Sequence, residues 1–433
     1  MIGFYDKVIK YLNKIRRDGF IKATRKAVIR VYGDYISILN PYTIIKYNIH
    51  KKKLEKYVDE LLENHQFERV LLWRSSIGWE IPLFQRPQHL SDFLSQKNCL
   101  VLYEVTKATD NVDFIVKKQE NLYLINYDNW LFIKMLEKKL AKINKNKYQF
   151  IASTTWDLKL KKIKQKIDKG YNLIYDYLDE LSSTLSGTNS LPHNVKEIYQ
   201  YVVEHQDVFV ICTADILYQD MLEKRGSKKN VVFACNGVSY EHFSKLDQNI
   251  NFTNDFNELL INKRPLIGYY GALAEWFDYD LIKTLAKELK DCDIVLIGVK
   301  YDLSFDANEI KNIENIHYLG SKKFNELPYY ASHFDVCILP FLLNDVTKAT
   351  SPIKIFEYMA LDKPIVTTDL QECRKYQSVK IGKTHKEFIG LVREMLQPIN
   401  KSYRAILKKE ALENTWESKV ITIIQGLTEL ENH

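Results

Sequence analysis

The sequence predicts an α/β protein with two doubly wound, Rossmann-like domains, and three observations lead to this. Short apolar runs alternate with Lys- and Glu-rich segments of helical spacing, a pattern typical of parallel strands and the helices that cover them. The length of 433 residues suits two or three domains, and 46% hydrophobic residues provide an adequate core. A polar segment, 247–265, interrupts the alternation and indicates a domain boundary.

Residues 1–60 are predicted to form a basic helical extension. Residues 1–55 contain thirteen Lys and Arg and four acidic residues, a local balance of +9, so the rest of the chain sums to −2. One face of the predicted helix is apolar and the rest is basic; the apolar residues are Phe4, Val8, Tyr11, Leu12 and Ile15. Such a helix can lie on an anionic membrane surface. The alternative is a solvated basic face packed on the body of the protein, and no nucleic-acid-binding module is recognisable.

The first β/α alternation predicts a domain over residues 61–246. A strand and turn at 67–76 leads into a helix that includes 90–96, and this helix returns to a strand at 99–105. Further predicted strands lie at 122–127, 148–154, 171–179, 207–214 and 230–238.

The second alternation predicts a domain over residues 247–410. Its strands are expected in the segments LIGYYGAL, DIVLIGV, IHYLG, DVCILPF and KPIVTT, which begin at 266, 293, 316, 335 and 363. A helical pattern at 416–431, within 411–433, would close the structure. Ligands of such sheets bind at the carboxyl ends of the strands, so we expect a site there.

A helix start after residue 349 is the strongest local signal for a ligand site. Thr350 or Ser351 can cap the helix and Pro352 suits its first position. The free amides and partial positive charge of this end, together with Lys354, favour a phosphate, and Glu357 lies one turn further, where it can accept from a ribose diol. The alternative is a capped helix that binds nothing.

Compartment and redox state follow from what the sequence lacks. It contains neither a long apolar run nor a cleavable secretory signal, so we expect a cytoplasmic protein. Six scattered cysteines without C-x-x-C spacing are expected to be reduced core residues.

Four segments occur in an order that resembles a known family: FQRPQHLSDFL (84–94), CNGVSYEHF (235–243), IGYYGALAEWFDYDLI (267–282) and SPIKIFEYMALDKPIVTT (351–368). Together they resemble the GT-B glycosyltransferases of the large retaining family four. The first segment is similar to a bacterial branch of teichuronic-acid and other surface-polysaccharide transferases. The resemblance covers roughly residues 67 to 425 and implies two domains facing a cleft, the N-terminal one for the acceptor and the C-terminal one for the donor.

The resemblance also implies roles for the residues around the predicted helix start. Glu357 would hold the ribose of a nucleotide sugar, while the backbone around Ser351, Pro352 and Ile353 and the ammonium of Lys354 would hold its diphosphate. These groups stabilise the charge that develops on the leaving diphosphate, so neither a metal ion nor another cofactor is expected.

The first strand-to-helix turn offers side chains where relatives have a glycine-rich loop. Only Gly78 is present there, and we expect Arg86, Gln88 and His89 to supply donors for the diphosphate. The alternative is that Arg86 and His89 cap a helix beginning at Pro87.

Acidic residues follow a predicted strand at Asp176, Asp179 and Glu180. Asp179 is the candidate that orients or deprotonates an acceptor hydroxyl. The alternative reading makes Asp179 a helix cap.

Two departures from the family pattern affect the donor. The loop with Glu275 lacks the basic residues of relatives, and Ala349 replaces the usual glutamate seven residues before Glu357. Asp345 or Glu372 is a candidate to reach the sugar instead. Retention of configuration therefore rests on the overall resemblance.

The resulting expectation is a hexosyl- or deoxyhexosyltransferase, peripheral on the inner face of the cell membrane. It would move a sugar from a nucleoside diphosphate to a lipid-linked or polysaccharide acceptor of the bacterial envelope. Two alternatives stay open: a nucleotide-sugar epimerase or phosphorylase on the same scaffold, and a non-catalytic relative in an assembly complex.

Overall fold

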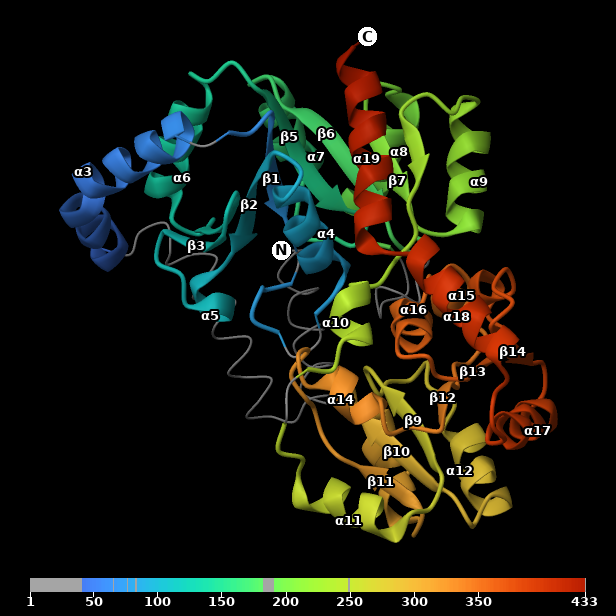
Figure 1. The fold of residues 1–433 in the computed structure, drawn as a ribbon. Coiled ribbons are helices and arrows are strands. Elements are labelled where there is room, and N and C mark those ends of the chain that lie inside the picture. The colour runs from blue at the N-terminus through green and yellow to red at the C-terminus, as the bar shows by residue number, and fades with distance from the viewer. Residues whose placement is uncertain are drawn as a thin grey trace, which may run out of the picture. The chain divides into compact units, whose positions relative to one another are not determined.

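A computed structural model describes residues 41–64, 66–75, 77–81, 84–181, 191–247 and 250–432 (Figure 1). The chain divides into two compact units. Unit 1 comprises residues 1–81 and 87–174, and unit 2 comprises 82–86 and 175–433. This division falls within β6 and does not coincide with the predicted boundary at 247, which stays a prediction.

The helices contain most of the segments predicted from helical spacing. They are α3 Pro41–Asn64, α4 Arg86–Ser95, α5 Lys107–Asp110, α6 Trp130–Leu140, α7 Leu160–Ile167, α8 His193–Glu204, α9 Asp215–Arg225, α10 Tyr240–Ser244, α11 Asn254–Asn262, α12 Tyr279–Glu288, α13 Ser304–Ala307, α14 Leu327–Ala331, α15 Asp345–Lys348, α16 Ile353–Ala360, α17 His385–Met395, α18 Lys401–Glu413 and α19 Trp416–Glu431, with 3-10 turns η1 Ile310–Asn312 and η2 Gln371–Cys373.

The strands follow the predicted apolar runs. They are β1 Arg69–Arg74, β2 Cys99–Val105, β3 Ile115–Gln119, β4 Leu122–Asn126, β5 Asn146–Ala152, β6 Asn172–Tyr177, β7 Phe209–Cys212, β8 Val231–Phe233, β9 Leu266–Tyr270, β10 Asp293–Ile297, β11 Ile316–Tyr318, β12 Val336–Leu339, β13 Ile365–Thr368 and β14 Val379–Gly382.

Unit 1 contains the strand order β3-β4-β2-β1-β5 and the first residues of β6. Strand β1 lies between β2 and β5, with Arg69 opposite Cys99 and Asn146, and these pairs are parallel. Strand β3 is antiparallel to β4 and forms the edge. The sequence did not predict β3 because none of its side chains is fully buried, so it lacks the apolar run of a central strand.

Unit 2 contains the end of β6 with β7 and β8, and a separate parallel sheet in the order β11-β10-β9-β12-β13-β14. The order reverses at the neighbouring strands β9 and β12. In doubly wound sheets a ligand crevice opens at the carboxyl ends of such a pair. Strand β14 was also not predicted, because its short sequence VKIG mixes apolar and polar residues.

Glycines at the carboxyl ends of β9 and β10 let two chain segments approach closely. Gly271 and Gly298 have φ angles of 152° and 145°, which L-residues rarely adopt. A Cβ atom on Gly298 would lie 1.7 Å from the carbonyl oxygen of Gly271. Both positions therefore require glycine.

Two local predictions need correction. The polar segment 247–265 is not a bare linker, because it contains α11, whose Phe256 and Leu259 are buried in the core. Helix α16 begins at Ile353, one residue later than predicted. Pro352 occupies its N-cap position, and no side chain caps the helix.

The C-terminal helix α19 begins and ends within the predicted segment and packs on strands of unit 2 (Figure 1). A Cβ on Gly426 would lie 2.8 Å from Phe209 of β7 and from Val232 of β8, so the helix lies directly against them. All six cysteines are buried and none forms a disulfide, as expected.

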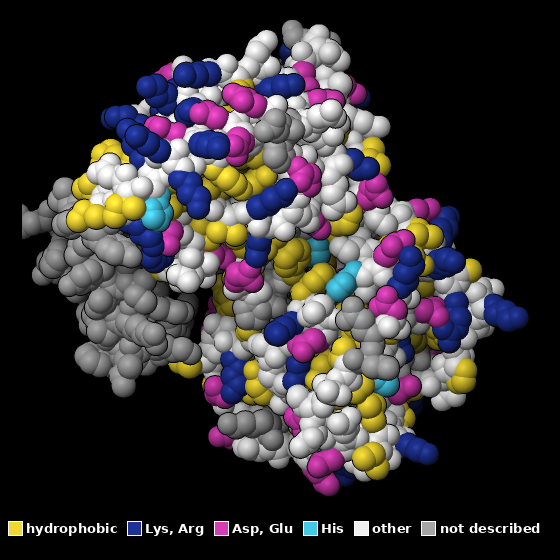
Figure 2. Space-filling model, turned by 60° about the vertical axis from the view of Figure 1, so that its left-hand side comes forward, with side chains coloured by type: hydrophobic (Ala, Val, Ile, Leu, Met, Phe, Trp, Pro, Cys, Tyr) yellow, Lys and Arg dark blue, Asp and Glu magenta, His cyan; other side chains and the backbone are white. Residues whose placement is uncertain are grey.

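The predicted membrane helix lies largely outside the described residues, which begin with α3. Among the described helices, none combines the length and the apolar character that crossing a bilayer requires. On the face drawn in Figure 2, Lys and Arg side chains lie in groups with Asp and Glu side chains between them.

Candidate functional site

The start of α16 is positioned in two ways: the helix itself packs in the core, and Ser351, which precedes its N-cap residue, is hydrogen-bonded to Asn236. Helix α16 follows β12, and its Ile355, Phe356 and Met359 are buried as the sequence pattern predicts. Ser351, 6% exposed, accepts from the backbone N–H of Asn236 through Oγ (3.2 Å) and from its side-chain Nδ2 through the carbonyl oxygen (2.6 Å). Asn236 therefore holds the residue that leads into the helix. The unpaired backbone N–H groups of the first turn form the partial positive end of the helix.

Lys354 is half-buried on the first turn of α16 and packs against Gly271. A Cβ on Gly271 would lie 2.5 Å from Cε of Lys354, so the missing side chain makes room for the lysine stem. Among the described residues, no carboxylate lies within ion-pair distance of its ammonium. Burial lowers the pKa of Lys354, and nearby Glu357 partly opposes this. An anion at this place would relieve the cost of the buried charge.

Glu357 lies one turn after Lys354 and is 5% exposed. Its Oε2 accepts from the hydroxyl of Tyr270, the last residue of β9, at 2.8 Å. Burial raises the pKa of Glu357, while Lys354 and the Tyr270 hydrogen bond lower it. The structure therefore brings together the predicted ribose and phosphate residues at the carboxyl end of β9.

Arg86 has other partners than the predicted phosphate. Its Nε and Nη2 each donate to Asp176 at 2.9 Å, and its Nη1 donates to the carbonyl of Cys235 (3.2 Å) and to Oδ1 of Asn236 (3.3 Å). The side chain is 4% exposed. A guanidinium buried this deeply requires a carboxylate partner. Its planar guanidinium binds both carboxylate oxygens of Asp176 through two hydrogen bonds, the geometry that was predicted for a diphosphate.

Gln88 and His89 belong to unit 1, in α4, and both are buried. Gln88 donates through Nε2 to the carbonyl of Gly78 at 3.1 Å. The loop after β1 is held further by Asp110, whose Oδ1 accepts from the backbone of residues 79 and 80. The side-chain bond of Gln88 thus serves the fold of this loop.

Asp179 follows β6, and the helix that it would cap in the alternative interpretation falls largely on residues 182–190, outside the described residues. Burial raises the pKa of its carboxyl to about 6, and the charge of neighbouring Asp176 adds to the shift. A carboxyl with a pKa near neutral pH is suited to accept a proton from a substrate hydroxyl.

The remaining donor candidates differ in exposure and in their partners within the protein. Glu275 is exposed and its N–H donates to Asp302 (3.0 Å), and Asp345 is exposed on α15. Glu372 is 2% exposed, and its two oxygens accept from the N–H of Asp215 (2.8 Å) and from Lys375 (2.7 Å). Both oxygens of Glu372 are therefore engaged within the protein.

Sequence reasoning missed the roles of Asn236, Asp176 and Tyr270. Asn236 and Gly237 lie in the segment 235–243, which contributed to the family resemblance, and a Cβ on Gly237 would lie 2.8 Å from the carbonyl oxygen of Asn414. The sequence CNGVS carried the only signal for Asn236. Tyr270 lies at the end of an apolar run that gave no sign of a polar contact.

Three comparisons with known proteins add to this geometry. Residues 264–394, which include Gly271, Lys354 and Glu357, match the family described as glycosyl transferases group 1. A curated relative, the putative teichuronic acid biosynthesis glycosyltransferase TuaH of Bacillus subtilis (strain 168), is 25% identical over 261 residues, 56% of this chain and 64% of its own length. The chain therefore spans less than two thirds of that relative.

Two solved structures share the fold. Sucrose-phosphate synthase from Thermosynechococcus elongatus has a TM-score of 0.63 at 11% identity, covering 84% of this chain and 99% of that one. Anabaena HepE in complex with UDP and glucose has a TM-score of 0.58 at 13% identity, with the same coverage of both chains.

The fold is of the GT-B type, and the matched domain is that of a glycosyltransferase. Within it, residues 264–394 carry a glycosyl transferases group 1 domain.

Proposed function

We propose that this protein transfers a sugar from a nucleoside diphosphate to a lipid-linked or polysaccharide acceptor of the bacterial envelope, with retention and without a metal ion. The observation that carries the proposal is Lys354, a half-buried ammonium without a carboxylate partner among the described residues, at the N-terminus of α16. It stands beside a buried Glu357 and within the residues that match the group 1 domain.

The donor fits the chemistry of these groups. The ammonium and the first-turn amides of α16 suit a diphosphate, and Glu357, with one oxygen bound to Tyr270, keeps lone pairs for a ribose diol. HepE binds UDP and glucose, which supports a nucleotide-sugar donor here.

Breaking the glycosidic bond leaves growing negative charge on the diphosphate. Positive groups that are fixed in place stabilise this charge more in the transition state than in the ground state, and removing one such donor commonly costs about 3 kcal/mol of transition-state stabilisation. Lys354 and the helix end supply this charge, so a metal ion is not needed for the step.

The acceptor side rests on Asp179 and the N-terminal segment. Asp179, with its pKa raised to about 6, would orient or deprotonate the acceptor hydroxyl. The basic residues 1–55 would hold the protein at the inner, anionic membrane surface, where a lipid-linked acceptor resides. The name of TuaH links it to an envelope polymer, which supports the choice of acceptor class.

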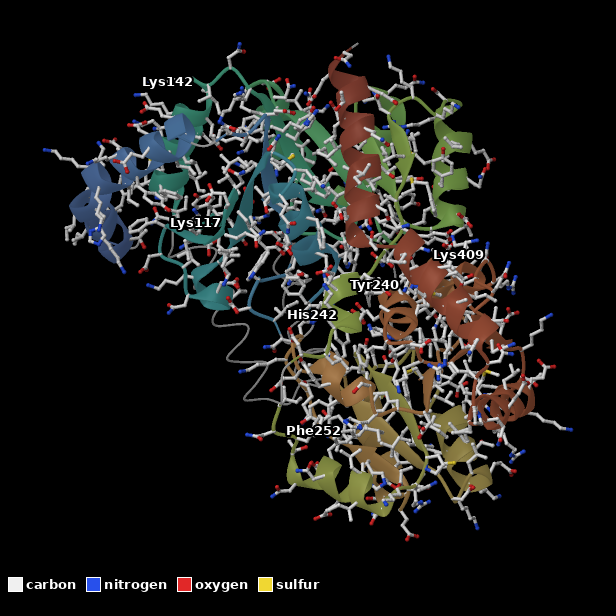
Figure 3. The ribbon with its side chains drawn as sticks, in the orientation of Figure 1. Lys117, Lys142, Tyr240, His242, Phe252 and Lys409 are labelled. Atoms are coloured by element: carbon white, nitrogen blue, oxygen red, sulfur yellow. The ribbon has the colours of Figure 1, made fainter. Side chains whose placement is uncertain are left out.

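Titration calorimetry with UDP, GDP, dTDP and their sugars tests the donor site. We expect one nucleotide to bind, and K354A and E357A to weaken it at least about tenfold, equal to about 1.4 kcal/mol. K409A is the matched control, because Lys409 is an exposed lysine on α18 (Figure 3) that pairs only loosely with Glu413. Equal affinities of wild type, K354A and K409A would reject the proposed donor site.

Ala349 favours one alternative, a non-catalytic relative in an assembly complex. It is fully buried where relatives carry a glutamate that touches the donor sugar. Absence of affinity for any nucleotide would support this alternative. Release of free sugar phosphate, or of an epimerised nucleotide sugar without acceptor, would instead support a phosphorylase or epimerase.

A further inference from the structure

A continuous set of polar contacts in unit 2 joins the end of β6 to the start of α16. Asp176, at 1% exposure, binds the guanidinium of Arg86 through two hydrogen bonds of 2.9 Å. Arg86 then donates to Oδ1 of Asn236, and Asn236 donates to the carbonyl of Ser351 through Nδ2. Ser351 directly precedes Pro352, the N-cap residue of α16.

Aromatic stacking fixes the segment that carries Arg86. Phe84 stacks on Phe324 with ring centroids 5.1 Å apart, and Phe324 also stacks on His242 of α10, at 4.4 Å and an interplanar angle of 10°. Figure 3 labels His242 on this helix. The guanidinium is therefore anchored by a stacked segment as well as by Asp176.

We propose that Asn236 is a positioning residue for donor binding: it transmits the fixed geometry of the Arg86–Asp176 pair to Ser351 and so sets the place of the first-turn amides of α16. The inference rests on the proposed function, because the diphosphate is assigned to those amides and to Lys354. It gives the Arg86–Asp176 pair a role in the site through their bonds to each other and to Asn236.

The side-chain amide is suited to this task because it accepts and donates at the same time. Its Oδ1 faces a guanidinium, which only donates, and its Nδ2 faces a carbonyl, which only accepts. Alanine makes neither of these side-chain bonds and keeps only the backbone N–H bond to Oγ of Ser351. Preorganised binding sites lose affinity when their groups move, so a Ser351 that is held by one bond less weakens the diphosphate contact.

The test compares nucleotide affinity with stability in the full chain. N236A is expected to weaken binding of the nucleoside diphosphate found in the calorimetric screen by about tenfold. N236S, which keeps a polar group too short to reach both partners, is the second variant if N236A does not fold. The two variants are expected to behave alike.

N315A is the matched control. Asn315 is buried and donates to the carbonyls of Ala286, Leu289 and Cys292, and it lies immediately before β11, at the amino end of the strand. We expect N315A to lower the melting temperature and leave the nucleotide Kd unchanged. A Kd of N236A and N236S equal to that of wild type would overturn the inference.

The two proposals fail in different ways. If K354A keeps full nucleotide affinity, the donor site itself is misplaced. If K354A loses affinity and the Asn236 variants do not, the donor site stands and Asn236 is only a structural residue. A loss in N315A equal to that in N236A would likewise show that the effect is one of general stability.

Discussion

The carboxyl of Asp179 should make the free energy of unfolding depend on pH, and the substitution D179N should remove this dependence. Its carboxyl has a pKa raised from 3.8 to about 6 by burial and by Asp176, so the folded state favours the neutral form. Below the unfolded pKa of 3.8 the carboxyl is protonated in both states and its contribution to stability is fully present. That contribution is lost as pH rises through about 6, and D179N, which cannot ionise, keeps it.

The size of the effect follows from the shift. A change of about 2 pKa units at about 1.36 kcal/mol each gives at most about 3 kcal/mol. For a chain of 433 residues, an unfolding entropy of about 2.1 cal/mol/K per residue converts this to about 3 °C in Tm. The side chain keeps some exposure to water, which makes this an upper value.

Differential scanning fluorimetry of wild type and D179N between pH 4 and pH 8, at constant ionic strength, measures the effect. The Tm difference should grow in favour of D179N from about pH 4 and level off above about pH 6. D247N, which neutralises an exposed aspartate of unit 2, is the control. A difference between wild type and D179N that stays flat across this range would refute the assignment of the raised pKa.

Three further perturbations test other parts of the structure. G271A places a Cβ 2.5 Å from Cε of Lys354, so nucleotide affinity measured by calorimetry should fall, whereas G390A, at an open position, should leave it unchanged. R86A leaves Asp176 buried and unpaired, which should cost about 3–5 kcal/mol of unfolding free energy in urea, and an intact midpoint would contradict the buried pair. Removal of residues 1–55 should abolish binding to anionic but not to neutral liposomes in a flotation assay, and equal flotation of both proteins would exclude a membrane role for this segment.

The sequence predicted those features that local chemistry determines. Central strands such as β2 and β9 are fully buried, so their apolar runs are unmistakable, whereas the exposed edge strand β3 and the mixed strand β14 carry no such run. Lys354 and Glu357 were predicted together because a separation of three residues places them on one helix face. The bond between Arg86 and Asp176 joins residues 90 positions apart, and nothing in either local sequence announces it.

Because Arg86 is paired with Asp176, the negative charge of the nucleotide diphosphate has to be neutralised by another cation. The guanidinium of Arg86 is bonded to Asp176. Among the predicted site residues of unit 2, Lys354 is then the cation that forms no ion pair with a described carboxylate. Its side chain packs against Gly271. Charge alone would make K354R a conservative change, but the planar guanidinium of arginine begins where Cε of Lys354 packs against Gly271.

We therefore expect K354R to weaken nucleotide binding by about as much as K354A, at least about tenfold, when the two are measured side by side by calorimetry. Near wild-type affinity in K354R would show that the position requires only a positive charge. In that case the close packing of Lys354 on Gly271 would not contribute to donor recognition, and G271A should then bind the nucleotide normally as well.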